Sequence, residues 1–526
     1  MVSDSVWASS VAWVVYLIAG VIYRLYFHPL AQFPGPKLAA ATGWYEFYHD
    51  IVKRGCFIWK IQELHDKYGT YLTQFLSHPI PIGNLAVPVS RSDTGPIVRI
   101  NPDELHIRDP DFYDELYAPA SKKRDKYDRW TILAGAPESS FATVSHSLHR
   151  LRRSALNPYF SKRAVANTEP LIWDKVERLC QRFAAAVKTK EIIRFDAAYM
   201  ALTMDIITHY AYGESYNYLA EDDFKLEWKE TVIGGSANGV FLRQFPWALG
   251  ILKATPLSVL KVMNPEAAQL VSWQHMVRRQ VDTILRNNRE GKKATGTVFQ
   301  AVIDSDLPPE EKSADRLQDE GQTLVGAGSE TTAKTLSIIT FYLNQDKTKL
   351  QKLRAELADV PLTPDGGSLL TRLEPLPYLT AVITEGLRLM YGVTTRLPRV
   401  AHEPLIYREW QIPPNTPVSQ SNYFVHMDPN IYPNPEEFLP ERWIEAKEKG
   451  IHLDRYMVSF SKGSRQCVGI NLAYAELYLT LSAIVRRFEF ENFETTVDDV
   501  RIAYDYFVGV PKLDSKGIRA VVTAEL

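Results

Sequence analysis

Cysteine is scarce in this chain, with only Cys56, Cys180 and Cys467 among 526 residues. An odd number of widely spaced cysteines excludes a disulfide framework and a dedicated zinc cage, and is typical of a reducing compartment. An excess of charge is also lacking, because 60 Lys and Arg residues balance 62 Asp and Glu residues. A nucleic-acid-binding protein would carry a marked basic excess, so the composition predicts no nucleic-acid partner.

Internal repeats, low-complexity tracts and long linkers are lacking as well. At about 150 residues per domain the length corresponds to roughly two to four domains, but no linker marks a boundary between them. No GxGxxG motif opens a βαβ unit, so the chain shows no nicotinamide or flavin fingerprint. With 45% apolar and 23% charged residues, the composition is that of an ordinary folded protein.

One apolar run near the N-terminus, Val6–Tyr23, contains no charged residue. As a helix rising about 1.5 Å per residue it would span roughly 27 Å, enough for a thin bilayer core. A cleaved secretory signal is the alternative. However, the residues before the run include Asp4 and lack a basic residue, and no small-residue cleavage site follows the run. Positive charges begin after the run, at Arg24, so residues 1–32 are predicted to be a membrane anchor with residues 33–526 in the cytosol.

Helical periodicity predominates from Pro170 onward, and strand-like runs are few and short. The pattern predicts a mainly α fold with small β-sheets. Helices are expected at Leu171–Val187, Trp273–Asn288, Ala314–Asn344 and Ile470–Phe488, and strands at Ile97–Ile100, Pro404–Tyr407 and Arg519–Thr523.

The most informative motif surrounds Cys467, where residues 460–469 read Phe-Ser-Lys-Gly-Ser-Arg-Gln-Cys-Val-Gly. The two glycines permit positive φ angles and leave room for a large flat group. The helical run that follows places Cys467 near a helix N-terminus, where unpaired N–H groups favour a thiolate, a soft ligand for iron. Cys56 and Cys180 lack such surroundings, and we interpret them as inert thiols.

This FxxGxRxCxG pattern resembles the haem-binding loop of the cytochrome P450 family of haem-thiolate monooxygenases. The resemblance implies that Cys467 is the axial ligand of a haem iron and that Arg465 holds a haem propionate. It also implies that Phe460 and Gly463 belong to the haem-binding loop. Ser461 stands where the family usually has a second glycine.

A second motif, Ala327–Thr332, lies in the middle of the longest predicted helix. A glycine in a helix interior costs about 1 kcal/mol, so Gly326 and Gly328 need a packing or functional reason. Packing glycines and a solvated Glu330 would explain the motif without any chemistry. Its resemblance to the oxygen-binding helix of the P450 family implies instead that Glu330 and Thr331 deliver protons during dioxygen activation.

Glu385 and Arg388 form an ExxR pair on one side of a predicted helix. A solvated pair of this spacing contributes only a few tenths of a kcal/mol, so alone it is weak evidence. Arg442 follows in a Pro-Glu-Arg-Trp motif. In this order the three residues resemble the Glu–Arg–Arg triad of the family, which implies that they position Cys467 and are not catalysts.

A basic helix face begins at His149 and ends at Arg153. Its spacing resembles the family's WxxxR motif, with His149 in place of the tryptophan, and implies that both residues reach the haem propionates. Arg399 matches an arginine that binds the other propionate. Arg150 and Arg152 are expected to face water.

The motifs follow one another as in fungal, endoplasmic-reticulum-anchored P450 monooxygenases of secondary metabolism. The resemblance implies insertion of one oxygen atom from O2 into a lipophilic terpenoid, polyketide or alkaloid, by hydroxylation or epoxidation. Electrons would come from NADPH through a separate cytochrome P450 reductase on the same membrane, with Lys462, Arg150 and Arg152 as docking candidates. Segments 127–141 and 245–252 match the family's pocket roof and access channel, and the second is expected to dip into the bilayer.

The stretch Thr70–Gly95 has no clear period and no counterpart in the family pattern, where Gly69 would run directly into Pro96. The helical pattern before it is expected to end at Tyr68-Gly69. A loop of this length inside a compact domain is uncommon. We interpret the stretch as a lineage-specific loop or as an unspliced intron.

Three other interpretations of the whole chain stay open. A haem-thiolate isomerase or dehydratase would keep Cys467 but would need no dioxygen activation, which the pair of Glu330 and Thr331 disfavours. A membrane-anchored haem carrier or sensor would bind haem without turnover. A helical scaffold would bind no haem.

Overall fold

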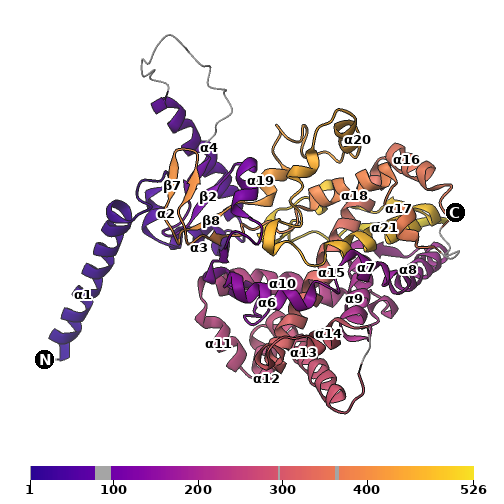
Figure 1. Cartoon of the computed structure of the whole chain (residues 1–526), viewed down its shortest axis with the longest axis horizontal. Coiled ribbons are helices and arrows are strands. Elements are labelled where there is room, and N and C mark those ends of the chain that lie inside the picture. Colours follow the sequence, from indigo (N-terminus) through magenta and orange to yellow (C-terminus); the bar gives the residue numbers. More distant parts are fainter. Residues whose placement is uncertain (1, 77–95, 294–295, 362–366) are drawn as a thin grey trace, which may run out of the picture.

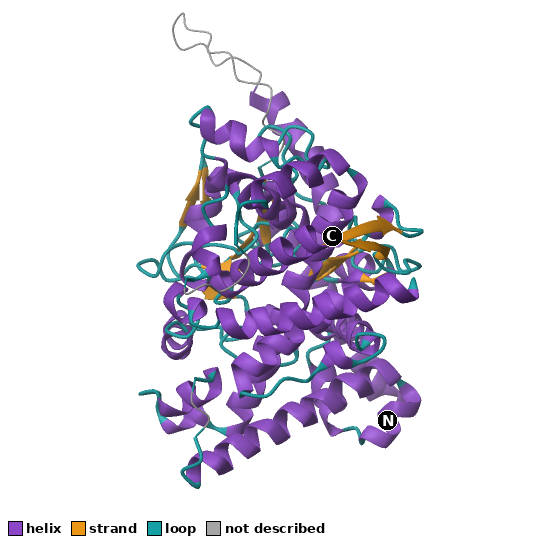
Figure 2. Ribbon diagram, turned by 90° about the vertical axis from the view of Figure 1, so that its right-hand side faces the viewer, coloured by secondary structure: helices purple, strands orange, loops and turns teal. Residues whose placement is uncertain are grey.

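Helices make up most of the molecule, which is represented by a computed structural model that describes residues 2–76, 96–293, 296–361 and 367–526. One helix, α1, projects from a body in which small sheets lie at the margins of the helices (Figures 1 and 2). The predicted mainly α fold with small β-sheets is confirmed.

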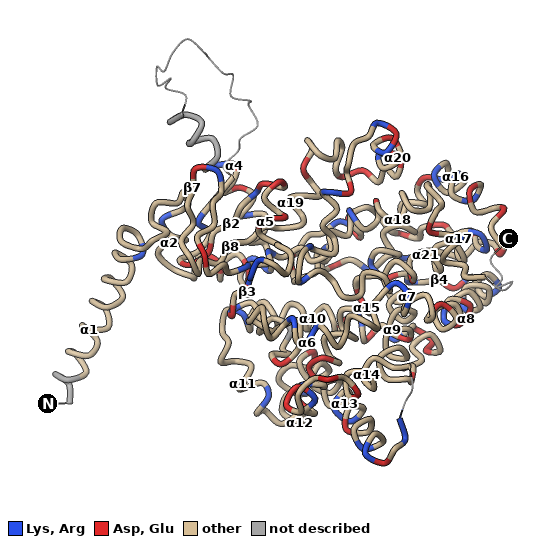
Figure 3. The backbone as a smooth tube through the Cα atoms, in the orientation of Figure 1, with Lys and Arg blue, Asp and Glu red and all other residues tan. Residues whose placement is uncertain are grey.

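The projecting helix consists of α1 (Val2–Ile22) and a π-helical turn, Tyr23–Phe27. The apolar stretch Val6–Phe27 is long enough to cross a membrane, and none of it is buried in the protein. Between Val6 and Tyr23 the projecting helix carries no charged residue, and Figure 3 shows this part without red or blue up to its junction with the body. These features fit the predicted membrane anchor.

A tight turn joins the anchor to the body. The N–H of Arg99 donates to the carbonyl of Pro34 over 2.7 Å, and a Cβ atom at Gly35 would lie only 2.4 Å from the carbonyl oxygen of Arg99. The buried Arg99 guanidinium also donates to the carbonyl of Arg24 over 2.9 Å. Only glycine fits at position 35, and the turn is fixed against the first strand of the body.

Many of the other helices of the described chain pack around one large apolar core, whereas α4 and α5 contribute to smaller clusters of their own. These other helices are α2 (Lys37–Ala41), α3 (Trp44–Phe47), α4 (Phe57–Leu76), α5 (Tyr113–Leu116), α6 (His146–Leu156), α7 (Lys162–Ala166), α8 (Glu169–Thr189), α9 (Phe195–Tyr212), α10 (Leu226–Gln244), α11 (Trp247–Ala254), α12 (Leu257–Met263), α13 (Pro265–Arg289), α14 (Val298–Asp304), α15 (Ala314–Gln345), α16 (Lys347–Leu357), α17 (Leu369–Leu373), α18 (Pro377–Met390), α19 (Asn422–His426), α20 (Glu441–Glu448) and α21 (Ile470–Arg487).

The four helices predicted from periodicity are present as α8, α13, α15 and α21. Their observed bounds differ from the predicted ones by at most two residues, except that α13 starts eight residues earlier than predicted, at Pro265. The helix α21 stops at Arg487 because Phe488 begins a strand. The expectation that the helical pattern ends at Tyr68-Gly69 is wrong, since α4 continues to Leu76. One interior glycine costs only about 1 kcal/mol, which is too little to end a helix with a well-buried first half. The rest of the unusual stretch, 77–95, lies outside the described residues.

The strands form small, mostly antiparallel sheets. One sheet has the order β1-β2-β8-β5-β3, in which β2 and β8 are parallel, and a second has the order β4-β12-β9. Two hairpins, β6-β7 and β10-β11, complete the set in the described chain. The strands are β1 (Ile97–Arg99), β2 (Leu105–Ile107), β3 (Asp125–Lys126), β4 (Ile192–Arg194), β5 (Arg399–Val400), β6 (Leu405–Tyr407), β7 (Trp410–Ile412), β8 (Pro417–Ser419), β9 (Phe488–Asn492), β10 (Tyr504–Tyr506), β11 (Val508–Val510) and β12 (Arg519–Glu525). All three predicted strands are present.

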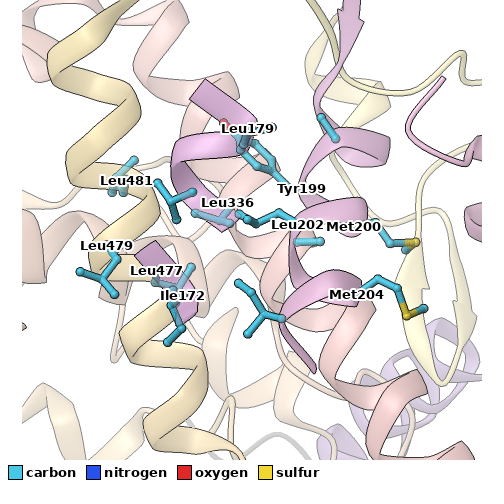
Figure 4. Packing of buried hydrophobic residues seen from close by; sticks show 14 of the residues in the cluster. Ile172, Leu179, Tyr199, Met200, Leu202, Met204, Leu336, Leu477, Leu479 and Leu481 are labelled. Atoms are coloured by element: carbon cyan, nitrogen blue, oxygen red, sulfur yellow. The ribbon is translucent and has the colours of Figure 1, made fainter. Parts of the chain in front are cut away.

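The core lies where α8, α9, α15 and α21 pack together. Figure 4 shows Ile172 and Leu179 of α8 beside Leu477 and Leu481 of α21, with α9 and Leu336 of α15 adjacent. Nearly every residue of α9 is buried. Because burial of apolar surface is the main stabilising contribution to folding, this packing makes α15 and α21 the rigid supports of whatever they carry.

A buried carboxylate connects α18 to the segment that precedes the cysteine loop. Glu385 accepts two hydrogen bonds from Arg388, at 2.9 and 2.7 Å, and one from Arg442 at 3.1 Å. The indole N–H of Trp443 and the backbone N–H of Leu439 each donate to the same carboxylate over 2.9 Å. Glu385 and Arg388 have no exposed surface, so this is not the solvated pair that spacing alone would suggest.

His426 links these buried residues to the start of the cysteine loop by hydrogen bonds. Its carbonyl accepts from Arg388 over 3.0 Å, and its Nε2 accepts from the backbone N–H of Val458 over 3.0 Å. Burial lowers the pKa of His426 to about 3, so the ring is neutral and can accept. The hydroxyl of Ser459 donates to the carbonyl of Leu387 over 2.8 Å. The start of the cysteine loop is therefore bonded to the buried triad.

Replacing Glu385 by Gln should strongly destabilise the protein, because two buried guanidinium groups would lose their charged partner. Breaking a buried ion pair from one side typically costs about 3–5 kcal/mol. Urea denaturation followed by far-ultraviolet circular dichroism measures the change. Glu177→Gln, which breaks a partly exposed pair with Arg487, is the control and should cost less than about 1 kcal/mol. Equal effects of the two substitutions would contradict this prediction.

Candidate active site

The cysteine loop is a tight backbone turn that leads into α21. The backbone N–H of Cys467 donates to the carbonyl of Phe460 over 2.9 Å, and α21 begins three residues later. Gly463 has a φ of 72°, and a Cβ atom there would lie 2.2 Å from the carbonyl oxygens of Tyr117 and Ala118. Glycine is therefore required at position 463. Its role is to allow the loop to pack closely against the backbone of Tyr117 and Ala118.

The Cys467 side chain keeps an exposed surface, although protein atoms surround it closely. Burial raises the pKa of its thiol, whereas the N–H of Gly469 and the charge of Arg153 lower it. The N-terminus of α21 therefore stabilises the thiolate form of Cys467 only in part. A metal ion bound to the sulfur would supply the remaining stabilisation, because metal binding deprotonates a coordinating thiol.

Several cations that the sequence assigns to propionate binding lie together beside this loop. Arg465 donates to the carbonyls of Thr143 and Val144 over 2.8 and 2.6 Å. Burial and the neighbouring Arg399 lower the pKa of Arg465 to about 9. Arg399 donates to the carbonyls of Leu397 and Pro398 and lies over the ring of Tyr117. Among the described residues neither guanidinium forms an ion pair, although the charge of Asp125 acts on Arg465 and opposes the effect of burial on its pKa.

Lys126 belongs to the same cluster, and the sequence motifs did not reveal it. It lies directly opposite Arg399 in the antiparallel pair β3–β5. Burial lowers its pKa well below the ordinary value, and so do Arg465 and Arg399. Its ammonium group donates to the carbonyl of Phe141 and lies 3.5 Å from the centre of the Phe141 ring. Like charges opposite each other in a sheet are unfavourable unless an anion is shared between them.

His149 and Arg153 face the same region from α6. Burial and the charge of Arg465 lower the pKa of His149 to about 2, so its ring is neutral, and its buried Nδ1 has no hydrogen-bond partner. Arg153 donates to Asn157 over 2.7 Å and lies close enough to influence the Cys467 thiol. Charge patches are also visible in Figure 3, where basic residues gather beside β3.

These features fit haem, whose two propionates are carboxylates. Buried cations without carboxylate partners need an anion, and the unpaired Nδ1 of His149 and Nε of Arg465 are unsatisfied in the protein alone. The cysteine sulfur lies in the same loop as Arg465. The residues present therefore suit a planar group with a soft metal ion and a negatively charged edge.

The glycines of α15 have different surroundings. A Cβ atom at Gly328 would lie 2.8 Å from Ile207 of α9, so this glycine allows the two helices to approach. A Cβ atom at Gly326 would meet nothing within 4 Å, and Ala327 is exposed although α15 is a core helix. The hydroxyl of Thr331 donates to the carbonyl of Ala327 over 3.0 Å. An open space thus borders α15 beside the predicted reactive threonine.

Glu330 is partly exposed, so it is neither a fully solvated nor a fully buried carboxyl group. Burial raises its pKa, while Lys334 and Lys229 lower it. Lys334 donates to the carbonyl of Gly509 in the β10–β11 hairpin, and burial lowers its pKa to about 8. Lys229 pairs with Asp196, and burial lowers its pKa to about 7. Sequence motifs gave no signal for Lys229, because it lies on another helix, α10. Lys334 follows Glu330 by four residues in α15, a spacing that the sequence does show.

Arg152 was expected to face water, and the structure shows that this expectation is wrong. Its guanidinium is buried and pairs with Glu311 over 2.6 Å, and it also donates to the carbonyl of Glu138. Arg152 is therefore not available to dock a reductase. Arg150 is exposed as expected, and Lys462 is partly exposed and pairs with Asp114 over 2.7 Å.

The other two cysteines have surroundings that suit inert thiols. Cys180 is fully buried in the core, and burial raises its pKa to about 12. Cys56 is partly buried, and burial raises its pKa as well. Neither thiol is activated, because a thiolate is the reactive form.

Comparison with known proteins was consistent with this site. The cytochrome P450 family matches residues 101–508. Conidiogenone synthase PchP450 of Penicillium rubens is 44% identical over 96% of this chain and 96% of its own length. Tryptophan 6-hydroxylase fscE of Fusarium equiseti is 42% identical over 95% of this chain and 94% of its own length. Cytochrome P450 monooxygenase claJ of Penicillium crustosum is 47% identical over 81% of this chain and 98% of its own length.

The fold agrees as well. A crystal structure of a cytochrome P450 (CYP102L1) has a TM-score of 0.65 to this chain at 18% identity, and covers 82% of this chain and 91% of that protein. This likeness concerns the fold alone. The family match and the sequence relatives show that this chain belongs to the cytochrome P450 family and is a monooxygenase of that family.

Proposed function

We propose that this enzyme inserts one oxygen atom from O2 into a lipophilic small molecule of fungal secondary metabolism, by hydroxylation or epoxidation. The observation that carries this proposal is the set of buried cations without carboxylates beside Cys467. Relatives named conidiogenone synthase and tryptophan 6-hydroxylase support a small-molecule substrate.

Haem, when bound, supplies dioxygen activation and oxygen insertion, which a thiolate ligand favours. Cys467 would bind its iron, and the loop from Phe460 through Gly463 would support it. The propionates would be held by His149, Arg153, Lys126, Arg399 and Arg465. The cations would then regain the negative partners that the protein itself does not provide.

Glu330 and Thr331 would deliver protons to the oxygen that leaves as water. Burial raises the pKa of Glu330, so this carboxyl group holds a proton to a higher pH than a solvated glutamate does. Lys229 pairs with Asp196, whose side chain is partly exposed, and its charge acts on Glu330. We therefore propose Lys229 as a residue through which protons from water reach Glu330.

Electrons would come from NADPH through a separate cytochrome P450 reductase, because the chain has no nicotinamide or flavin fingerprint. The exposed Arg150 and the partly exposed Lys462 are candidates for its docking surface. Residues 1–32 would hold the protein in the endoplasmic reticulum membrane. Residues 33–526 would form the single monooxygenase domain in the cytosol.

The substrate would enter from the membrane side. Segment 245–252 is largely the helix α11, on which Trp247 and Ile251 are 64% and 59% exposed. Trp44, which is 63% exposed, lies beside Phe245 with a ring separation of 6.4 Å. An exposed apolar surface of this kind near a membrane anchor favours contact with lipid.

Expression in microsomes with a reductase, followed by mass spectrometry of candidate metabolites, tests the reaction. We expect a product that has gained one oxygen atom, with NADPH and O2 consumed. Cys467→Ala should abolish the product and the carbon monoxide difference spectrum of thiolate-ligated haem. Product formation by the Cys467→Ala enzyme would refute the proposal. An isomerised or dehydrated product formed without O2 uptake would do the same.

Thr331→Ala should uncouple electron use from product formation. A proton-delivery group contributes on the order of 10²–10⁴ to a rate, so product per NADPH should fall steeply while NADPH use continues. Measurement of product, NADPH and hydrogen peroxide in the same reaction checks this. Thr332→Ala is a neighbouring control in the same helix. Equal coupling in Thr331→Ala and wild type would contradict the assigned role.

Lys126→Met should weaken haem retention, because one of the cations that face the propionates is lost. The readout is the rate of haem transfer to excess apomyoglobin, which needs no substrate. Lys122→Met removes an exposed lysine that pairs with Glu115, so it changes net charge equally. We expect faster haem loss from Lys126→Met than from Lys122→Met. Equal rates would exclude Lys126 from the haem site.

A further inference from the structure

Lys334 connects α15 to the β10–β11 hairpin and has no part in the proposed reaction. It follows Glu330 by four residues, so the two side chains lie on the same side of the helix and within reach of each other. Its ammonium group nevertheless donates to the carbonyl of Gly509 in the hairpin. In the described part of the chain, no ion pair joins Lys334 to Glu330. The hairpin therefore holds this lysine away from the acid that is its neighbour in the helix.

Two lysines act on Glu330, and both are bonded to other groups. Lys229 of α10 pairs with Asp196, just as Lys334 bonds to Gly509. Both lower the pKa of Glu330 through their charge, against a larger opposite effect of burial. The remaining charged groups at this place surround Lys229, and they are Arg194, Asp196 and Glu230. Glu330 and Lys334 each keep some exposed surface, so both side chains have room to move.

The hairpin that holds Lys334 is itself held by Thr394, which lies four residues after α18. The backbone N–H of Thr394 donates to the carbonyl of Phe507 over 3.0 Å, and its hydroxyl donates to Asp505 over 2.8 Å. Asp505 also accepts from the backbone N–H of Phe507 over 3.2 Å. The position of the Gly509 carbonyl, and with it the position of the Lys334 ammonium group, therefore depends on this small set of hydrogen bonds.

The turn of the same hairpin reaches the side of the proposed haem site. Phe507 lies between β10 and β11 with a φ of 77°, a left-handed conformation that a bulky side chain rarely adopts. Its ring packs edge-on against that of Phe141, with ring centres 5.7 Å apart. The ammonium group of Lys126, from the cationic cluster, lies over the Phe141 ring. Strained residues persist where their surroundings enforce them, which is frequent at ligand sites. A ligand beside Phe141 would therefore meet the hairpin at Phe507.

We propose that Lys334 is a positioning residue that couples the β10–β11 hairpin to Glu330. With the hairpin in place, the carbonyl of Gly509 holds the ammonium group, and Glu330 keeps a proton that it can deliver. When the hairpin shifts, the ammonium group is released and pairs with Glu330, which gives its proton to water and stays ionised. A ligand that presses on Phe507 thus acts on proton delivery without touching the acid. The inference rests on the proposed role of Glu330 in proton delivery.

Infrared titration of the Glu330 carboxyl group in full-length, haem-loaded enzyme tests this coupling without any substrate. The carbonyl band of the protonated group is identified as the band that Glu330→Gln removes, and its pH midpoint is measured. Lys334→Met should raise the midpoint by on the order of one pH unit, because a cation that favours the ionised form is lost. Lys334→Arg keeps the cation and should stay close to wild type. Lys347→Met is the matched control, since Lys347 donates to another strand carbonyl, that of Phe490, over 2.9 Å. This control should leave the midpoint unchanged.

Thr394→Val loosens the hairpin and leaves Lys334 and Glu330 intact, because it removes only the hydroxyl that bonds to Asp505 and to the carbonyl of Phe507. Its midpoint should fall, since the released ammonium group then pairs with Glu330. Adding Lys334→Met should abolish this fall, so the double variant should titrate like Lys334→Met alone. Hydrogen exchange at residues 504–510 shows independently whether the hairpin is looser. If it is not, Asp505→Ala, which removes the shared acceptor, replaces Thr394→Val in the same cycle.

The two substitutions should move the midpoint in opposite directions, which a merely structural role of Lys334 would not do. An unchanged midpoint in Lys334→Met would overturn the coupling, and so would a fall in Thr394→Val that survives in the double variant. Product per NADPH should fall in Thr394→Val and recover in the double variant. If the midpoints move as expected while product per NADPH stays constant, the coupling stands and the proposed role of Glu330 fails. If no variant forms product, the proposed function fails and the midpoints alone decide the coupling.

Discussion

Arg399 and Lys126 stand opposite each other in adjacent strands, and Arg465 lies beside them. Several other buried arginines in the described part of the chain have acidic partners: Arg388 has Glu385, Arg243 has Glu46, and Arg152 has Glu311. The buried Arg99 instead donates to the carbonyls of Arg24 and Pro102. The cations beside the cysteine loop differ from both cases, because several of them gather in one place without a carboxylate, which leaves them to an external anion. The surrounding architecture follows from this requirement for an anion. The strand β5, the helix α6 and the cysteine loop each place a cation at the same position.

The motifs made much of this arrangement predictable from the sequence. Backbone geometry requires particular residues at particular positions of the loop, such as glycine at 463. The loop can therefore be identified in the sequence from the identity and spacing of these residues. The triad of Glu385, Arg388 and Arg442 is equally local, since each member occurs in a short pattern on or beside a helix. The long helices α15 and α21 were predictable because burial of one face imposes a regular apolar period.

Other features depend on contacts between distant segments and left no local pattern. Lys126 occurs in a two-residue strand, and only its pairing with Arg399 brings it to the site. Arg152 was placed in water because its neighbours are basic, yet Glu311, far along the chain, pairs with it in the interior. The end of α4 was misjudged for another reason, because a single glycine weakens a helix less than tertiary packing stabilises it.

Glycines fix two helices against their neighbours. In α15, a Cβ atom at Gly328 would lie 2.8 Å from Ile207, so this glycine brings the helix against α9 and holds it in the core. In α10, a Cβ atom at Gly239 would lie 2.4 Å from the carbonyl oxygen of Leu133, so this glycine holds the helix against the segment Asp128–Ala134 in the same way. A reaction that must exclude water needs a fixed support for the reacting groups. Close packing at these two glycines contributes to that support, because a larger side chain at either position would push the helix away from its neighbour.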